Sequence, residues 1–184
     1  MPTTQTTLLH FALRAEAQAF IEKLKLEPIP RTARSYALFG NARYIALIGG
    51  IGAEATQTSL EHFFTADPLA RQMTKACNIG IVGCNDVRVA IGTLFVFDPY
   101  EPPSLPPIVS VQTPQSASDT PTTTLYDMEC DAFVRTLRRC LPHTRLTVCK
   151  VVSDHLDDAR PSKAFVKELM LQHYQTIREV LDAR

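Results

Sequence analysis

The sequence lacks several features that mark common classes of protein. It has no excess of charge, because Lys and Arg together number 19 and Asp and Glu together also number 19. Nucleic-acid-binding proteins usually present a basic surface, so this balance argues against nucleic acid as a partner. No apolar run approaches the roughly 20 residues that span a bilayer. The first residues show no basic segment followed by an apolar one. We therefore expect a cytoplasmic protein with no membrane partner.

The cysteines and histidines do not form a metal-binding pattern. No CxxC pair is present, and no histidine lies three to five residues from another. A zinc site is therefore not expected, and the sequence indicates no other metal or cofactor. The number of cysteines is odd and most lie among apolar residues, which favours reduced thiols in the core. The cysteines are Cys77, Cys84, Cys130, Cys140 and Cys149.

Short apolar runs alternate with segments whose apolar residues recur at helical spacing. This alternation predicts an α/β sheet wrapped by helices, in one domain that spans residues 1–184. The predicted strands cover 6–12, 36–39, 44–48, 77–83, 92–98 and 147–152, with a possible short strand at 108–111. The predicted helices cover 14–24, 53–64, 131–140 and 162–181. Seven of the 13 prolines lie between Pro99 and Pro121, which predicts a proline-rich loop at about 99–123.

The stretch from Thr147 to His155 is the first candidate for a functional site. Val148, Val151 and Val152 favour a buried strand, and Ser153-Asp154 follows where that strand ends. Ligands of open α/β sheets bind at the carboxyl ends of strands, and a half-buried carboxyl group there can act as an acid. The alternative is that Ser153 or Asp154 caps a following helix.

Glycines at 49, 50 and 52 form a second candidate, because they lie between a predicted strand and a predicted helix. A glycine-rich turn that leads into a helix can bind an anion or a sugar. The same pattern also occurs where a helix packs so closely on a sheet that only glycine fits. The sequence does not decide between these two interpretations.

Four segments, taken in order, resemble the nucleoside phosphorylase/nucleosidase superfamily, and in particular its members that hydrolyse methylthioadenosine and S-adenosylhomocysteine. The segments are Ala12-Leu13-Arg14-Ala15-Glu16-Ala17, Gly50-Ile51-Gly52-Ala53, Tyr126-Asp127-Met128-Glu129-Cys130 and Lys150-Val151-Val152-Ser153-Asp154. The third resembles the family's V-E-M-E-A segment and the fourth its V-x-S-D segment. The resemblance implies a three-layer fold with a central mixed β-sheet flanked by helices.

The resemblance also implies roles for individual residues. Asp154 would be the acid that protonates the purine at N7, and Ser153 would orient it. Glu16 would activate the attacking water, and its alternative role is that of a solvated charge on the predicted helix 14–24. Glu129 would accept hydrogen bonds from the ribose hydroxyls, and Met128 would pack against the sugar. The remaining pocket residues would be Ile51, Gly52 and Gly83. The implied partners are a nucleoside substrate and a second copy of the chain in a homodimer.

The sequence departs from the family in two places. The family's T-G-S-A-G-G loop is replaced by residues 82–87, which contain fewer glycines. The stretch between Asp98 and Tyr126 is shorter than in the family and offers only Tyr100 as an aromatic that can cover a base. Three functions therefore stay open: a nucleoside hydrolase, which we favour, a phosphorylase, and a nucleoside-binding or partner subunit without turnover. Phosphorolysis would require a phosphate clamp, for which Arg14, Arg43 and Arg88 are the candidates.

Overall fold

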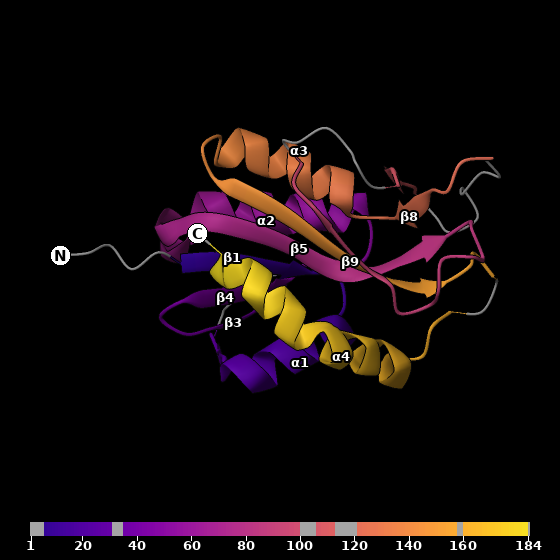
Figure 1. Cartoon of the computed structure of the whole chain (residues 1–184). Coiled ribbons are helices and arrows are strands. Elements are labelled where there is room, and N and C mark those ends of the chain that lie inside the picture. Colours follow the sequence, from indigo (N-terminus) through magenta and orange to yellow (C-terminus); the bar gives the residue numbers. More distant parts are fainter. Residues whose placement is uncertain (1–5, 31–34, 100–105, 113–120, 158–159, 184) are drawn as a thin grey trace.

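The computed structural model describes residues 6–30, 35–99, 106–112, 121–157 and 160–183, and these form one nine-stranded sheet with four α-helices (Figure 1). The strands are β1 (Thr6–Phe11), β2 (Glu27–Pro28), β3 (Ala37–Gly40), β4 (Tyr44–Ile48), β5 (Met73–Cys84), β6 (Leu94–Phe97), β7 (Ile108–Ser110), β8 (Leu125–Asp127) and β9 (Arg145–Asp154). The helices are α1 (Arg14–Leu24), α2 (Ala53–Ala66), α3 (Cys130–Cys140) and α4 (Lys163–Asp182), with a 3-10 helix at Pro68–Gln72.

The sheet is mixed, and its centre is parallel. One path of neighbours runs β2-β3-β4-β1-β5-β8-β7, while β9 pairs with both β5 and β6. β1, β4, β5 and β9 run parallel to their neighbours within this group, so their carboxyl ends meet at one edge. β2, β3, β6 and β8 add antiparallel pairs at the periphery. The strand β5 is long enough to pair with β1, β8 and β9, and it therefore connects the two halves of the sheet.

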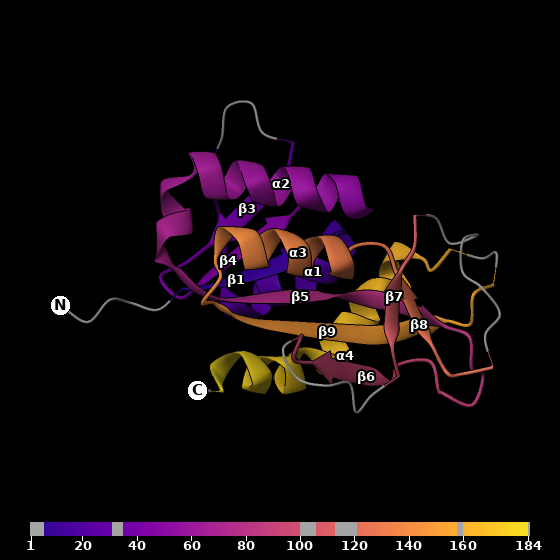
Figure 2. The same cartoon turned by 90° about the horizontal axis from the view of Figure 1, so that it is seen from above.

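Helices cover both faces of the sheet, as Figures 1 and 2 show from two directions: α2 and α3 lie over one face, and α1 and α4 over the other. Successive residues of a strand point to opposite faces. Leu8 packs toward the α2 and α3 side, whereas Leu9 packs toward α1 and α4. Ala76 and Cys77 divide in the same way. The three-layer α/β fold predicted from the sequence is therefore confirmed.

Several element boundaries differ from the predictions. β5 begins at Met73 rather than at residue 77, and β9 begins at Arg145 rather than at residue 147. The predicted hairpin forms as β3 and β4, which pair antiparallel with Leu38 opposite Leu47. The possible strand at 108–111 is present as β7. The strands β2 and β8 and the 3-10 helix had not been predicted, because each is too short to show a hydrophobic period.

In the residues that the structure describes, no helix is both long and apolar enough to cross a membrane. Within the same residues, no group of three or more His, Cys, Asp or Glu side chains is arranged to hold a metal ion.

Candidate functional site

The sheet face beneath α2 and α3 changes from apolar to polar toward the carboxyl ends of its parallel strands. On β1, Leu8 is followed on the same face by His10, and on β5, Ala76 is followed by Asn78. On β9, Leu146 and Val148 are followed on the same face by Lys150. All three polar side chains are buried. A buried polar layer at this edge lies where open α/β sheets bind ligands.

Glu16 is buried at this edge, with only 3% of its surface exposed. Its Oε2 accepts hydrogen bonds from the backbone N–H groups of Ala12 at 3.1 Å and Leu13 at 2.8 Å. Its Oε1 accepts one from the N–H of Ile81, on β5, at 3.0 Å. Burial raises the pKa of Glu16 to about 7, although Lys150 and these N–H groups pull it down. Glu16 is therefore not a solvated helix charge, and it can exchange a proton near neutral pH.

Glu129 lies at the start of α3 and reaches across to the start of α2. Its Oε1 accepts a hydrogen bond of 2.7 Å from the N–H of Gly52. Burial raises the pKa of Glu129 above its ordinary value, and the charge of Lys150 opposes that rise. Gly52 has a φ of 94°, which favours glycine, and a Cβ at this position would lie 4.0 Å from Cε of Met128. One side of the candidate site is thus formed by the carboxyl group of Glu129, by Met128 and by the glycine-rich turn.

An ion pair between Lys150 and Asp127 lies at the centre of the polar layer. Nζ of Lys150 is 2.8 Å from Oδ2 of Asp127, and both side chains are almost fully buried. Burial alone would lower the pKa of Lys150, but the carboxyl groups of Asp127 and Glu129 raise it above its ordinary value. The same Oδ2 accepts the N–H of Cys130 at 2.8 Å, so Asp127 also binds the first backbone N–H of α3. A fixed positive charge therefore lies close to both candidate carboxyl groups.

His10 and Asn78 form a neutral pair next to this charge. Nδ1 of His10 is 2.9 Å from Nδ2 of Asn78. Burial, and then the charge of Lys150, lower the pKa of His10 to about 3, so His10 is neutral at physiological pH. A Cβ on Gly49 would lie 3.0 Å from Nε2 of His10, so the glycine-rich turn packs directly on this histidine. The close-packing interpretation of the glycines therefore holds at Gly49, while Gly52 faces the candidate site.

Asp154 ends β9 and is held by its neighbours. Its Oδ2 accepts a hydrogen bond of 2.6 Å from Oγ of Ser153, and its Oδ1 accepts one of 3.0 Å from the N–H of Leu156. It does not cap a helix, because α4 begins only at Lys163 and its first turn is capped by the side chain of Ser162. The carboxyl group is half-buried, and its orientation is fixed by Ser153, the residue that the sequence had nominated for that task.

Two glycines of β5 lie directly against two carboxyl groups of the candidate site, those of Glu16 and Asp154. A Cβ on Gly80 would lie 2.6 Å from Oε1 of Glu16. A Cβ on Gly83 would lie 3.0 Å from Oδ1 of Asp154 and 2.6 Å from Cδ2 of Leu156. The carboxyl groups of Glu16 and Asp154 therefore pack against the same strand three residues apart, each at a glycine whose replacement by a larger residue would displace it. The fold brings Glu16, Glu129 and Asp154 to one edge of the sheet.

The other nominated residues are not part of this buried cluster. The side chain of Ile51 is 56% exposed and thus at the surface. Arg14 stacks on the ring of Phe39. Arg43 pairs with Asp182 at 3.0 Å, near the amino end of β4. Arg88 binds Asp86 through two nitrogens, at 2.9 and 2.8 Å. Tyr100 lies outside the described residues.

Three residues of the cluster were missed by the sequence interpretation: Asn78, Gly80 and Lys150, whose partner is Asp127. Lys150 carried a usable signal. It stands in a run of β-branched residues that predicts a strand buried on both faces, and a buried lysine requires an acidic partner. That partner, Asp127, lies 23 positions away in the sequence, a pairing that no local pattern identifies.

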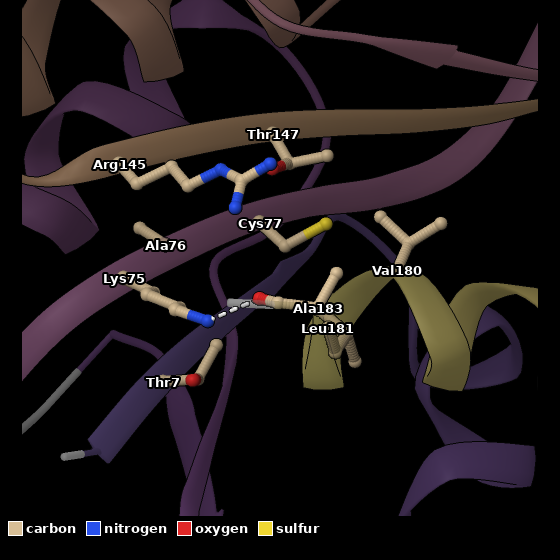
Figure 3. Close-up of a pocket in the computed structure, with 9 residues that line it drawn as sticks. All are labelled: Thr7, Lys75, Ala76, Cys77, Arg145, Thr147, Val180, Leu181 and Ala183. Carbon is tan, nitrogen blue, oxygen red and sulfur yellow. Dashed lines mark hydrogen bonds between the residues drawn. The ribbon is translucent and has the colours of Figure 1, made fainter.

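A separate pocket lies at the opposite end of the strands (Figure 3). Its lining includes Thr7, Lys75 and Arg145, which lie at the amino ends of β1, β5 and β9, and the end of α4. Nζ of Lys75 donates a hydrogen bond of 2.6 Å to the carbonyl oxygen of Ala183. This pocket contains none of the residues of the candidate site.

The fold is that of solved nucleosidases of the nucleoside phosphorylase/nucleosidase type. Among solved structures, 5'-methylthioadenosine/S-adenosylhomocysteine nucleosidase from Helicobacter pylori is similar, with a TM-score of 0.72 and 14% identity over 97% of this chain and 98% of that chain. The corresponding nucleosidase from S. pneumoniae gives a TM-score of 0.74 and 14% identity, covering 97% and 99%. Futalosine hydrolase from Helicobacter pylori gives 0.72 and 15%, covering 97% and 98%.

The sequence itself matches no protein-family model, and no curated protein matches it. The likeness to the solved structures therefore establishes the fold, and the chemistry has to be argued from the residues of the site.

Proposed function

We propose that this protein is a nucleosidase that hydrolyses the N-glycosidic bond of a purine nucleoside or thionucleoside, such as methylthioadenosine or S-adenosylhomocysteine. The observation that carries the proposal is the buried carboxyl group of Glu16. Its pKa of about 7, its fixed orientation and its position at the carboxyl edge of the parallel strands suit a general base. The fold is that of known nucleoside hydrolases, which supports the same conclusion.

Hydrolysis of a nucleoside requires two proton transfers. Glu16 takes a proton from water as the water oxygen bonds to C1′ of the ribose. The C1′–N bond breaks at the same time, and Asp154 delivers a proton to N7 of the departing purine. Glu129 accepts hydrogen bonds from the ribose hydroxyls, with Met128 against the sugar. An acid and a base each contribute roughly 10²- to 10⁴-fold to the rate.

The carboxyl group of Asp154 is held in one orientation by its surroundings. The hydroxyl of Ser153 and the N–H of Leu156 each donate to one of its oxygens, which fixes the direction in which it faces. Fixed orientation lowers the activation barrier considerably, because the reaction rate falls steeply when the proton donor is displaced from its partner. Gly83 provides the space beside it, and Gly52 and Ile51 complete the rim of the proposed pocket.

Phosphorolysis is the second candidate, and the arginines disfavour it. A phosphate clamp requires cationic side chains that converge on one point. Arg14, Arg43 and Arg88 instead contact Phe39, Asp182 and Asp86, respectively. Arg43 in addition lies toward the amino end of β4, away from the carboxyl edge. The third candidate is a nucleoside-binding or partner subunit without turnover. Such a protein would bind the ribose through Glu129 and Met128, but it would not need a carboxyl group such as Glu16 that exchanges a proton near neutral pH.

The three candidates are separated by incubating the protein with a panel of purine nucleosides and thionucleosides, with and without phosphate. We expect free base and a free reducing sugar in samples without phosphate. Product that appears only with phosphate would replace hydrolysis by phosphorolysis. Binding of a nucleoside without release of base would leave the third candidate.

The Asp154→Asn variant tests the proposed acid. It keeps the size of the side chain but removes the proton donor, so we expect kcat/KM for base release to fall by roughly 10²- to 10⁴-fold. Asp157→Asn is the matched control, because Asp157 is exposed and lies three residues away. An Asp154→Asn variant with full activity would refute the assignment.

We also propose that the protein acts as a homodimer. Five large apolar residues are exposed at separate places on the described chain, and a second copy docked at the glycine-rich turn would bury the first of them. They are Ile51, Val87, Ile91, Val109 and Leu171. Ile51 belongs to the glycine-rich turn, so an interface that covers it would also close the rim of the pocket. Sedimentation at micromolar concentration should give the mass of a dimer, and a monomer would contradict the proposal.

A further inference from the structure

The edge strand β7 comes from the proline-rich segment and is fixed against β8. The two strands run parallel, with Ser110 opposite Asp127. The N–H of Val111 donates to the carbonyl oxygen of Asp127 at 2.7 Å, and the N–H of Leu125 donates to the carbonyl oxygen of Pro107 at 2.9 Å. Backbone hydrogen bonds on both sides of Ser110 therefore set its position.

The hydroxyl of Ser110 joins this edge strand to the buried ion pair. Its Oγ donates to Oδ1 of Asp127 at 2.5 Å and accepts the N–H of Asp131 at 3.0 Å. The other oxygen of Asp127 receives Nζ of Lys150 and the N–H of Cys130, each at 2.8 Å. Ser110 thus contacts Asp127 on the side away from Lys150, and it also contacts the first turn of α3.

We propose that Ser110 is a positioning residue of the site: it holds Asp127, and through Asp127 it fixes Lys150 and the start of α3, which carries Glu129. This inference rests on the proposed nucleosidase function. It assigns a task to the proline-rich segment, for which the sequence had predicted a loop with a short strand at 108–111. The segment supplies one hydroxyl to the polar layer.

The physical reason lies in the burial of Asp127. A buried carboxylate that loses one hydrogen bond is not compensated by water, so it moves toward its remaining donors or draws in another. The remaining donors are Lys150 and the N–H of Cys130. A shift of Asp127 therefore moves Lys150 relative to Glu16 and Glu129, and it loosens the turn on which Glu129 begins.

Three variants test the inference. Ser110→Ala removes the hydroxyl, Ser110→Thr keeps it, and Val109→Ala is the matched control on the same strand, where the side chain is 42% exposed and points to the other face. For the best nucleoside of the panel, we expect Ser110→Ala to lower kcat by about tenfold, the size of the loss of one hydrogen bond to a charged group. KM should rise as well, because the loosened turn carries Glu129, the proposed ligand of the ribose hydroxyls. Ser110→Thr should restore kcat, and Val109→Ala should leave it unchanged.

Amide hydrogen exchange gives a readout that does not depend on turnover. The N–H groups of Cys130 and Asp131 donate to Asp127 and Ser110, so both should exchange faster in Ser110→Ala and at the normal rate in Val109→Ala. If the wild-type protein releases no base, the nucleosidase proposal fails, while unchanged exchange would overturn the role of Ser110 independently. A Ser110→Ala variant that loses thermal stability but keeps kcat would also overturn it, because the role would then be structural alone.

Discussion

The titration of Glu16 makes the stability of the protein depend on pH, and the Glu16→Gln variant tests this dependence. Its pKa is about 7 in the folded protein against 4.5 in the unfolded chain. A carboxyl group whose pKa is raised by folding stabilises the folded state below the unfolded pKa and loses that contribution as the pH rises through the folded pKa. The Glu16→Gln variant cannot titrate at this position and lacks this pH dependence.

The magnitude follows from the two pKa values. Each unit of difference corresponds to about 1.4 kcal/mol, and between pH 5 and pH 8 the linkage amounts to about 2.5 kcal/mol. Glutamine also loses one of the three accepted N–H bonds, at a cost of about 1–3 kcal/mol that does not depend on pH. The stability of the variant relative to the wild type should therefore rise by about 2.5 kcal/mol from pH 5 to pH 8, so that its deficit at pH 5 nearly disappears or is reversed at pH 8.

Urea unfolding of both proteins at pH 5 and pH 8 measures this change. Titration of every other group contributes almost equally to both proteins, so the difference in unfolding free energy isolates Glu16. A gap that stays constant between the two pH values would refute the argument that burial raises the pKa of Glu16. The same titration predicts that base release rises with pH through about 7, because Glu16 accepts a proton only when it is ionised.

Two further substitutions test the centre of the site. Lys150→Met leaves Asp127 as an unpaired buried charge, so the unfolding free energy should fall by about 3–5 kcal/mol, and adding Asp127→Asn, which removes the charge but keeps an acceptor for the N–H of Cys130, should recover part of the loss. A single Lys150→Met variant as stable as the wild type in urea would contradict the buried ion pair. Gly80→Ala places a Cβ 2.6 Å from Oε1 of Glu16, so the carboxyl group must move, and base release should fall by about a hundredfold while circular dichroism shows an intact fold. Unchanged activity in Gly80→Ala would contradict the role of Glu16 as the general base.

The local sequence determined much of the fold, because periodicity is a local property. Apolar residues at a spacing of three and four predicted α1 and α4, and β-branched runs predicted the centres of β5 and β9. The strands β2 and β8 have two and three residues and are held by pairing with partners distant in sequence. Such strands carry no period of their own, so their presence was decided by the sheet around them.

The candidate site divides in the same way. Glu16, Glu129 and Asp154 were nominated from short motifs, because the chemistry requires those residue types at strand ends and helix starts. Burial decided what they can do. The sequence left Glu16 between a solvated helix charge and a base, and only packing against Gly80 and Ile81 removed it from water.

Charge pairing in the interior lay beyond the sequence. In the sequence, Lys150 is a single charged residue within an apolar run, and Asp127 is the residue before Met128 in a short motif. Their contact depends on β8 and β9 both lying beside β5, which is a property of the sheet as a whole. The sequence by itself determined which residue types reach the edge of the sheet. The tertiary structure decided which of them are paired and buried, because burial and pairing depend on residues far apart in the chain.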